Sequence, residues 1–294
     1  MKKMIVKCTL LAILSLPTML CISCVVTLLG GNLTGNASIV YTAIERAGQE
    51  NDYRAVCIGD SVCNQLWQIN EEDGKVFHLA TNASITVCGN YLLLKEYLEN
   101  NKQTETVYYI VCPQNLNIDA SKSTDSFIYF VIPFCTRENL ALLTPRSRVD
   151  LEEKFGSPFV KSFVLKSVLQ NSNLWLNRYL ILVDRKGSGQ DNTEEAKELR
   201  LSVTSATYLK KMQELCDEYG VSLILRASPL MDDETRDDVT GLAQNALELG
   251  VNDIVSEYIQ GIRYYPKEWF ADGVHLTREA LAQYGDMLRA ERIP

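Results

Sequence analysis

Short apolar runs alternate with longer amphipathic segments along most of this chain. Strands that are covered on both faces of a parallel sheet are almost continuously apolar, and four runs have this character: Ala55–Gly59, Val76–Ala80, Val107–Cys112 and Ser222–Arg226. Apolar residues recur at helical spacing in three other segments: Tyr91–Asn100, Ser202–Tyr219 and Asp233–Leu249. Strands that alternate with helices predict an α/β domain of three layers, α/β/α, around a parallel sheet.

The chain is long enough to form one sizeable domain. It has 294 residues, of which 46% are apolar, and a chain of this size can bury a substantial core. We expect the α/β domain to occupy residues 51–294, after a linker at residues 32–50. Residues 119–200 fit the alternation of strands and helices poorly, and we interpret them as an insertion or cap over the sheet.

Residues 1–31 predict a membrane anchor. Lys2, Lys3 and Lys7 precede an apolar stretch that runs from Cys8 to about Leu29 without a charge. About 20 helical residues cross a bilayer core that is about 30 Å thick. A secretory signal usually has a shorter apolar region, so we favour one uncleaved transmembrane helix over a cleaved signal. Lysines ahead of the span place the N-terminus inside and the domain outside the cytoplasm.

The charge balance excludes nucleic acid as a partner. The chain carries 29 Lys and Arg against 37 Asp and Glu, a net charge of −8, which repels a phosphate backbone. The histidines and cysteines do not show the spacing of a metal site, and we expect no metal and no cofactor. Cys57 and Cys112 lie in apolar runs, which predicts buried free thiols. Cys63 and Cys88 are the pair for which a disulfide is hardest to exclude.

A serine follows the first apolar run in Gly59-Asp60-Ser61. Sites in open α/β sheets lie beyond the carboxyl ends of the strands, so we expect Ser61 at that edge. A serine between strand and helix can act as a nucleophile, because N–H groups at the helix start can hold an oxyanion. The alternative is a turn that the hydroxyl caps. We interpret Asp60 as a partner of the helix start, since a carboxylate suits that end of the helix dipole.

A nucleophilic serine needs a base, and the chain has two histidines. His78 lies within an apolar run, where a structural histidine is the commoner case. His275 follows Asp272 by three residues across a glycine. At this spacing the carboxylate can reach one ring nitrogen and leave the other for Ser61. We therefore predict a triad of Ser61, His275 and Asp272.

Two motifs together give the chain a resemblance to the SGNH, or GDSL-type, hydrolase family. That family carries Gly-Asp-Ser after its first strand and Asp-x-x-His near its end, matched here by Gly59-Asp60-Ser61 and Asp272-Gly273-Val274-His275. Either motif alone arises often by chance, but both in this order, at opposite ends of an α/β pattern, are specific. The resemblance covers about residues 50–290 in layout. It implies a flavodoxin-like sheet in which Gly59 and Asp60 support a catalytic Ser61.

The resemblance also implies oxyanion donors in two further blocks. Asn82-Ala83-Ser84 stands where the family has Asn-x-Gly, so the backbone N–H of Ser84 would replace that of the glycine. The third block, Gly-x-Asn, is matched by Pro113-Gln114-Asn115, in which Asn115 corresponds to the oxyanion asparagine. The chain thus departs from the family at both glycines. Capping of loops by Asn82 and Asn115 is the alternative, because Asn is a common turn residue.

These departures, with the N-terminal anchor, resemble a branch of the family at bacterial cell surfaces. Its members are related to proteins of D-alanyl-lipoteichoic acid synthesis and polysaccharide O-acetylation. The resemblance implies a serine esterase or O-acyltransferase that acts on an acylated glycan or related surface ester, beside a membrane-bound acyltransferase. It leaves hydrolysis and transfer open, because both proceed through an acyl-serine. The alternative class is a non-catalytic SGNH-like scaffold that partners such an acyltransferase.

Overall fold

A parallel four-stranded sheet forms the centre of the computed structural model. The structure describes residues 2–28, 38–67, 76–121, 126–176, 199–232 and 239–290. Four strands make up this sheet: β1 Ala55–Gly59, β2 Val76–His78, β3 Thr106–Val111 and β4 Ser222–Ala227. Their order is β2-β1-β3-β4, and all neighbours are parallel. The sequence-based prediction of an α/β domain with a parallel sheet is therefore confirmed.

The strand order places β1 and β3 at the centre of the sheet. Their register pairs Gly59 with Ile110, so both strands end at the same edge. Val56, Ile58 and Val107 in these strands are fully buried, because helices cover both faces of the sheet. Whatever follows the two strands consequently meets at one rim of the domain.

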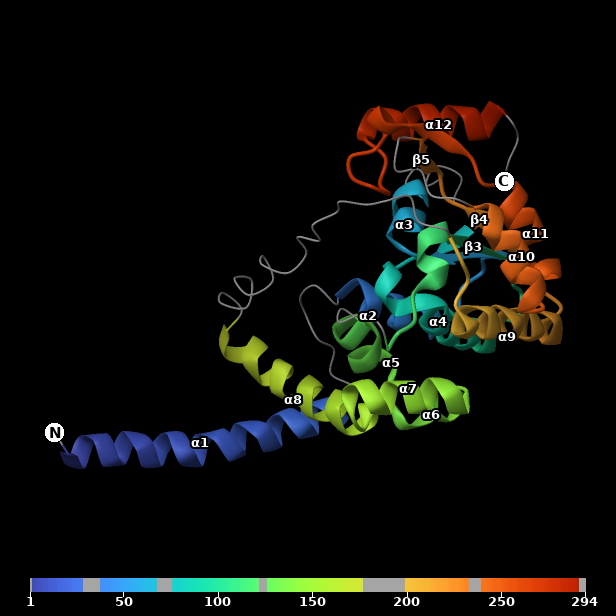
Figure 1. Cartoon of the computed structure of the whole chain (residues 1–294). Helices are drawn as coiled ribbons and strands as arrows, with labels where there is room; N and C mark the ends of the chain where they lie inside the picture. The colour runs from blue at the N-terminus through green and yellow to red at the C-terminus, as the bar shows by residue number, and fades with distance from the viewer. Residues whose placement is uncertain are drawn as a thin grey trace.

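Helices cover both faces of the sheet. Figure 1 shows α4 (Thr86–Asn100) and α9 (Val203–Tyr219), with α2 (Ser38–Ala47), on one side of the strands. On the other side lie α3 (Ser61–Trp67) and, beyond it, α12 (Arg278–Ala290). The remaining helices of the C-terminal part are α10 Thr240–Glu248 and α11 Asn252–Gln260. The start of the helix expected at Asp233–Leu249 falls partly outside the described residues.

Helix α2 occupies part of the segment that we expected to be a linker. Val40, Ala43 and Ala47 on one of its faces are buried in the main core. They repeat at intervals of three and four residues, which is the spacing of one helical face. Residues 38–47 therefore pack as a part of the α/β domain.

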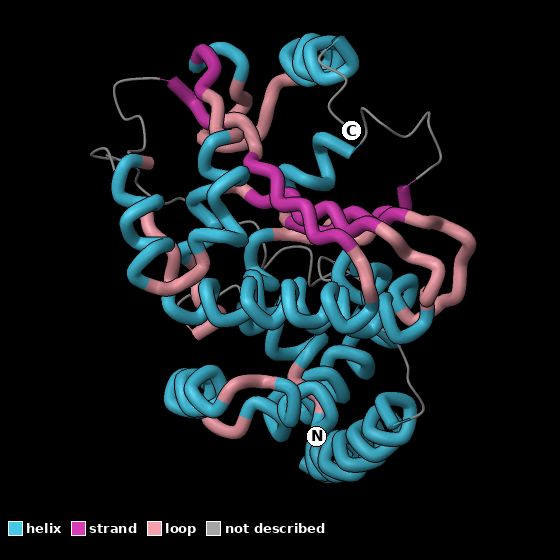
Figure 2. Tube along the Cα trace, turned by 90° about the vertical axis from the view of Figure 1, so that its right-hand side faces the viewer, coloured by secondary structure: helices cyan, strands magenta, loops and turns pink. Residues whose placement is uncertain are grey.

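Residues 119–200 contain a group of helices rather than strands. In order, the described ones are a π-helix at Phe127–Val131, α5 Ile132–Phe134, α6 Arg137–Leu142, α7 Pro145–Phe155 and α8 Pro158–Leu176. Figures 1 and 2 show that α6, α7 and α8 form a layer beyond α4, on the side of that helix away from the sheet. The insertion that we expected over the sheet thus covers a helical layer instead.

Helix α1 (Lys2–Leu28) lies beside α8 at this end of the molecule (Figure 1). The hydroxyl of Ser23 is buried there and donates a hydrogen bond to the carbonyl of Ser167. Within the part of the chain that the structure describes, no helix is long and apolar enough to cross a membrane. The transmembrane helix expected from the sequence is therefore not supported by the structure.

A second, two-stranded sheet lies near the C-terminal segment. It pairs β5 (Leu230–Asp232) with β6 (Tyr264–Pro266) in parallel. Short 3-10 turns at Ala83–Ile85, Pro113–Asn117 and Lys267–Trp269 complete the described elements. An isolated antiparallel bridge between Phe270 and Leu276 closes the loop that carries Asp272 and His275.

Candidate active site

Ser61 begins α3 directly after β1, at the carboxyl edge of the sheet. Gly59 makes this tight passage possible. A Cβ atom there would lie 2.0 Å from the carbonyl oxygen of Ile110 and 2.7 Å from Cβ of Cys63. Its φ of +156° is also rarely adopted by residues with side chains. A glycine is thus required for the strand to turn into the helix against its neighbour β3.

The Asp60 side chain fixes the start of α3. Its Oδ1 accepts hydrogen bonds from the backbone N–H groups of Val62 at 3.0 Å and Cys63 at 3.3 Å. These are two of the N–H groups that a helix start leaves without partners inside the helix. The side chain is buried, and its other oxygen, Oδ2, accepts bonds from Cys112 and Asn115 at the end of β3. Asp60 therefore caps the helix and connects it to the next strand.

Ser61, His275 and Asp272 form a continuous hydrogen-bonded chain. The distance from Oγ of Ser61 to Nε2 of His275 is 2.9 Å, although 214 positions separate the two residues. On the far side of the ring, Nδ1 of His275 lies 2.9 Å from Oδ2 of Asp272. The structure thus brings together the three residues of the predicted triad in the order that nucleophilic catalysis uses.

The loop around His275 is built to hold its ring. Oδ1 of Asp272 accepts the backbone N–H groups of Val274 at 2.9 Å and His275 at 2.7 Å, while Oδ2 faces the ring. Burial acts to raise the pKa of Asp272, but the two N–H groups and the ring of His275 outweigh it. The pKa of Asp272 consequently lies below its ordinary value. The carboxylate is ionised at neutral pH and orients the imidazole.

The residues expected to donate to an oxyanion are engaged in local bonds. Oδ1 of Asn82 accepts the backbone N–H of Ser84 at 3.0 Å and so caps the 3-10 turn at Ala83–Ile85. Nδ2 of Asn115 donates to Oδ2 of Asp60 at 2.6 Å. An amide nitrogen carries two hydrogens, so Asn115 keeps one donor beyond this bond. Asn82 therefore caps the turn, as the alternative expected. Asn115 is anchored to Asp60 and still has one N–H that could bind an oxyanion.

Thr86 has an unusual backbone conformation next to this turn. Its φ is +58°, which residues other than glycine seldom adopt and which is an outlier for a β-branched side chain. The residue is buried, and its hydroxyl has no hydrogen-bond partner among the described residues. Backbone strain of this kind gathers at functional sites. No pattern in the sequence indicates this conformation.

His78 lies in the sheet and not beside Ser61. It ends β2 and pairs in register with Cys57 of β1. Burial, and then the positive charge of Arg46, lower the pKa of His78 to about 4. The ring is therefore neutral at physiological pH, as expected of a structural histidine.

The cysteines whose side chains the structure describes are free thiols. Cys63 and Cys88, the pair for which a disulfide was hardest to exclude, are not joined by one. The sulfur of Cys63 lies 3.1 Å from that of Cys57 instead, and both side chains are fully buried. Burial raises the pKa of Cys88 to about 12. Such thiols behave as small core residues.

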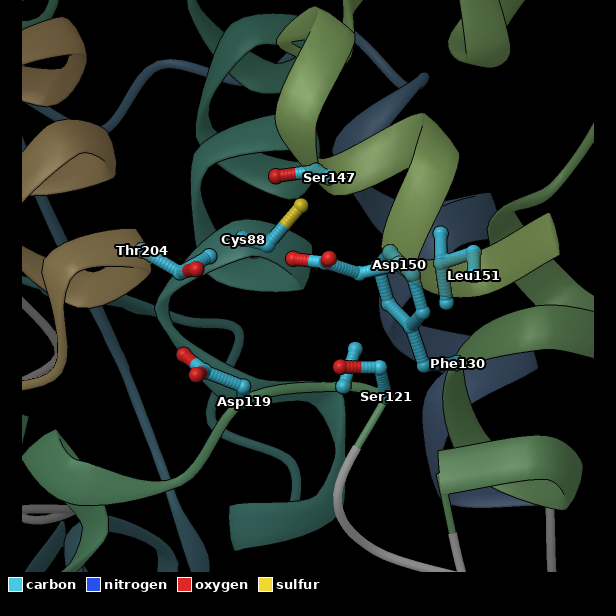
Figure 3. Close-up of a pocket in the computed structure, with 9 residues that line it drawn as sticks. Cys88, Asp119, Ser121, Phe130, Ser147, Asp150, Leu151 and Thr204 are labelled. Atoms are coloured by element: carbon cyan, nitrogen blue, oxygen red, sulfur yellow. The ribbon is translucent and has the colours of Figure 1, made fainter. Parts of the chain in front are cut away.

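A small pocket lies apart from the triad, between α4, α7 and α9 (Figure 3). Cys88 of α4 points into it, and Asp119 and Asp150 also line it. Asp119 already accepts a hydrogen bond from the Ser202 hydroxyl at 2.5 Å. In the part of the chain that the structure covers, no group of three potential metal ligands is present.

Comparisons with known proteins add little to this geometry. No protein-family model matches the chain, and no curated protein matches it. A solved structure described as "a putative platelet activating factor from Streptococcus pneumonia" is similar to it, with 10% sequence identity and a TM-score of 0.36. The similarity covers 86% of this chain and 91% of that chain. A likeness of this size carries no argument, so the interpretation of the site depends on its own geometry.

Proposed function

We propose that this chain is a serine-dependent acyl-ester hydrolase or O-acyltransferase of the SGNH type. One observation carries the proposal: Oγ of Ser61, the ring of His275 and the carboxylate of Asp272 are joined by two bonds of 2.9 Å. A structural histidine has no need of a serine on one nitrogen and an ionised carboxylate on the other. This arrangement is what an acyl-transferring serine requires.

The proposed reaction begins when Ser61 attacks an ester carbonyl. Nε2 of His275 accepts the hydroxyl proton as the new C–O bond forms, and Asp272 holds the ring in the tautomer that leaves Nε2 free. The backbone N–H of Ser61 and the second amide hydrogen of Asn115 would bind the oxyanion, and one such donor contributes about 3 kcal/mol. His275 then returns the proton to the leaving alcohol, and an acyl-serine remains.

The second half of the reaction decides between hydrolysis and transfer. Water that attacks the acyl-serine gives a carboxylic acid, whereas a sugar hydroxyl gives a new ester. The departures at Asn82-Ala83-Ser84 and Pro113-Gln114-Asn115, with the predicted N-terminal anchor, resemble the cell-surface branch of the family and support a cell-envelope glycan or related surface ester as the substrate. The proposed partner is a membrane-bound acyltransferase, which would supply or share the acyl group.

A second function is favoured by a different observation. The N–H of Ser84 is bonded to Asn82 and the Asn115 amide to Asp60, so two groups expected at the oxyanion have partners within the protein. This is what a non-catalytic SGNH-like scaffold, retained as a partner of the acyltransferase, would show. Such a scaffold would keep the fold without reactivity at Ser61.

Reaction with a fluorophosphonate probe and turnover of p-nitrophenyl acetate test the proposal on the full chain. We expect both, with the phosphonate on Ser61 by peptide mass spectrometry, and loss of both in Ser61→Ala. Ser222→Ala is the matched control, because Ser222 is exposed at the start of β4, at the edge of the sheet away from Ser61. A folded protein that neither labels nor turns over would instead be the scaffold.

The extracytoplasmic location and the membrane anchor remain sequence-based proposals. They are supported by Lys2, Lys3 and Lys7 ahead of the apolar run Cys8–Leu29. Fractionation of cells that express the full chain, followed by protease treatment of intact cells, tests them. Recovery in the soluble cytoplasmic fraction would contradict both.

A further inference from the structure

Two hydrogen bonds join the helix of Ser61 to the segment that carries His275. Nε2 of Gln65 donates to the carbonyl oxygen of Leu276 at 2.8 Å, and the N–H of Leu276 donates to Oε1 of Gln65 at 2.9 Å. The side-chain amide thus pairs with a peptide group as a neighbouring β-strand would. Two parallel contacts fix both the position and the rotation of the segment.

The two ends of this contact lie next to the catalytic pair. Gln65 follows Ser61 by four residues on α3, and side chains at this spacing share one helical face. Leu276 follows His275 directly in the chain. The amide therefore bridges the nucleophile and the base at a short distance from both, although 211 positions separate Gln65 from Leu276.

The backbone of Leu276 has a structural need for such a partner. Leu276 pairs with Phe270 in the antiparallel bridge, whose two hydrogen bonds are made by flanking residues. Ala271 donates to the carbonyl of His275 at 2.8 Å, and Thr277 to that of Trp269 at 2.7 Å. In a pair of this kind, the N–H and C=O of the central residue point away from the bridge.

Because Leu276 is only 2% exposed, its backbone groups must find partners within the protein. Gln65 supplies both of these partners, a donor and an acceptor, from one side chain. The amide therefore takes the place of a third strand beside the small bridge.

The Gln65–Leu276 contact and the Asp272–His275 pair position different parts of the site. Asp272 and His275 belong to the same loop, so their bond orients the ring relative to that loop. The bonds of Gln65 orient the loop relative to α3 and hence relative to Ser61. A weak Ser61–His275 bond on an otherwise untethered loop would leave the distance between Oγ and Nε2 free to vary.

We infer that Gln65 is a positioning residue that sets the Ser61–His275 geometry by tying the backbone at Leu276 to α3. The inference rests on the proposed function for its effect on rate, while the tether itself is independent of it. Both hydrogen bonds of the Gln65 amide go to Leu276 and not to the reacting hydroxyl or the imidazole, so it acts through the placement of the loop. Catalysis is sensitive to such placement, since an error of about 1 Å can reduce a rate by about 100-fold.

Gln65→Met in the full chain removes both bonds and keeps the length and apolar stem of the side chain. We expect kcat for p-nitrophenyl acetate to fall by about 10- to 100-fold, with KM changed less than about threefold, because the substrate contacts remain. Gln213→Met is the matched control, since the Gln213 amide bonds Asp217 on the surface of α9 at 2.8 Å. A folded Gln65→Met protein with the kcat of this control would overturn the inference.

Gln65→Asn covers the case in which a half-buried Met without hydrogen bonds prevents folding. It keeps the amide but shortens its reach by one methylene, so we expect the same loss of kcat. Undiminished kcat in a folded Gln65→Asn protein counts against the inference in the same way.

Hydrogen exchange separates the tether from the proposed function. Peptides that cover residues 270–277 should exchange at least about tenfold faster in Gln65→Met than in Gln213→Met, because the N–H of Leu276 loses its acceptor. If the wild-type chain neither turns over nor labels at Ser61, the proposed function fails. Exchange alone then decides: faster exchange supports the tether, and unchanged exchange overturns it.

Discussion

Asn115 donates a hydrogen bond from Nδ2 to Oδ2 of Asp60 at 2.6 Å. The same oxygen accepts the backbone N–H of Cys112 at 2.8 Å, and Oδ1 accepts Val62 and Cys63 at the start of α3. One buried carboxylate thus receives four donors from two segments. This single carboxylate therefore fixes both the turn before Ser61 and the side chain of Asn115, which would face an oxyanion.

Asp60→Asn should destabilise the protein and also reduce activity. An amide at this position presents an NH₂ group to donors from one of the two segments, which leaves buried N–H groups without acceptors. Each such group costs about 1–3 kcal/mol, so we expect the free energy of unfolding to fall by about 3 kcal/mol. Urea denaturation measures the loss. Asp217→Asn on the surface of α9 is the control and should change stability by less than about 0.5 kcal/mol.

Asp272→Asn should reduce activity far more than stability. The new NH₂ group would donate to Nδ1 of His275, which forces the other tautomer and places a hydrogen on Nε2. The ring then cannot accept the proton of Ser61, and we expect kcat to fall by about 10³- to 10⁴-fold. Steady-state kinetics measure this loss, with urea denaturation as the check on folding. A loss of less than tenfold would contradict the role given to Asp272.

The pKa of Asp272 adds a condition to this experiment. Because its pKa is lowered in the folded protein, the carboxylate stabilises the fold above its ordinary pKa of 3.8. That contribution is lost only as the pH falls through the lower, folded value. Loss of activity on mild acidification above pH 4 should therefore not come from protonation of Asp272. The Asp272→Asn comparison can be made at pH 7 to 8 without this complication.

The strands of the four-stranded sheet were predictable from sequence because each is a short and largely apolar run. β1 has the predicted bounds, Ala55–Gly59, since the run is ended by a glycine that the fold requires. The pair β5 and β6 was not predicted. Each has three residues, which is too short for a periodic pattern, and their pairing depends on segments far apart in the chain. Helix α2 was missed although its apolar positions carry helical spacing.

The candidate site was predictable only where a motif marks it. Ser61, Asp272 and His275 were expected from two short motifs, and in the structure the His275 ring is hydrogen-bonded to both of the others. Gln65 had no such signal, because a polar residue on a helix usually faces solvent. Its position four residues after Ser61 shows which face it shares, but only the fold shows that the backbone of Leu276 lies there. The strain at Thr86 likewise depends on packing.

His78 should make the stability of the protein fall with mild acidification. Burial lowers its pKa from 6.5 to about 4 in the folded protein, so between these values the unfolded chain binds a proton that the folded chain does not. Stability due to the neutral ring is complete above pH 6.5 and is lost as the pH falls toward 4. We expect a loss on the order of 2 kcal/mol across this window, discounted for partial exposure of the ring.

Urea denaturation at a series of pH values tests the role of His78. In His78→Gln, whose side chain stays uncharged, the decline between pH 6.5 and 4 should be clearly smaller than in wild type. Equal declines in the two proteins would mean that other groups cause the acid sensitivity. The direction of the effect is opposite to that of a histidine stabilised by a carboxylate, and the comparison with His78→Gln assigns it to this ring.

Thr86→Gly should stabilise the protein, in contrast to most substitutions by glycine. The φ of +58° strains a threonine but not a glycine, and such strain costs about 1–3 kcal/mol. The substitution also removes a buried hydroxyl that has no partner among the described residues. Against these gains stand the backbone entropy of glycine, about 0.5–1 kcal/mol, and the loss of two buried carbon atoms, Cβ and Cγ2, about 0.8 kcal/mol each. The balance is a gain of about 1 kcal/mol.

Thr207→Gly provides the matched contrast to this prediction. Thr207 lies within α9, where its hydroxyl bonds the carbonyl of Val203 at 2.8 Å, so its backbone is helical and unstrained. There the same substitution should lower the free energy of unfolding by about 0.5 kcal/mol, because glycine has a lower helix propensity than threonine. Urea denaturation of both variants under one set of conditions measures the two signs. A loss of stability in Thr86→Gly as large as in Thr207→Gly would show that the backbone at Thr86 stores no strain, and the turn beside Ser84 would then be an ordinary one.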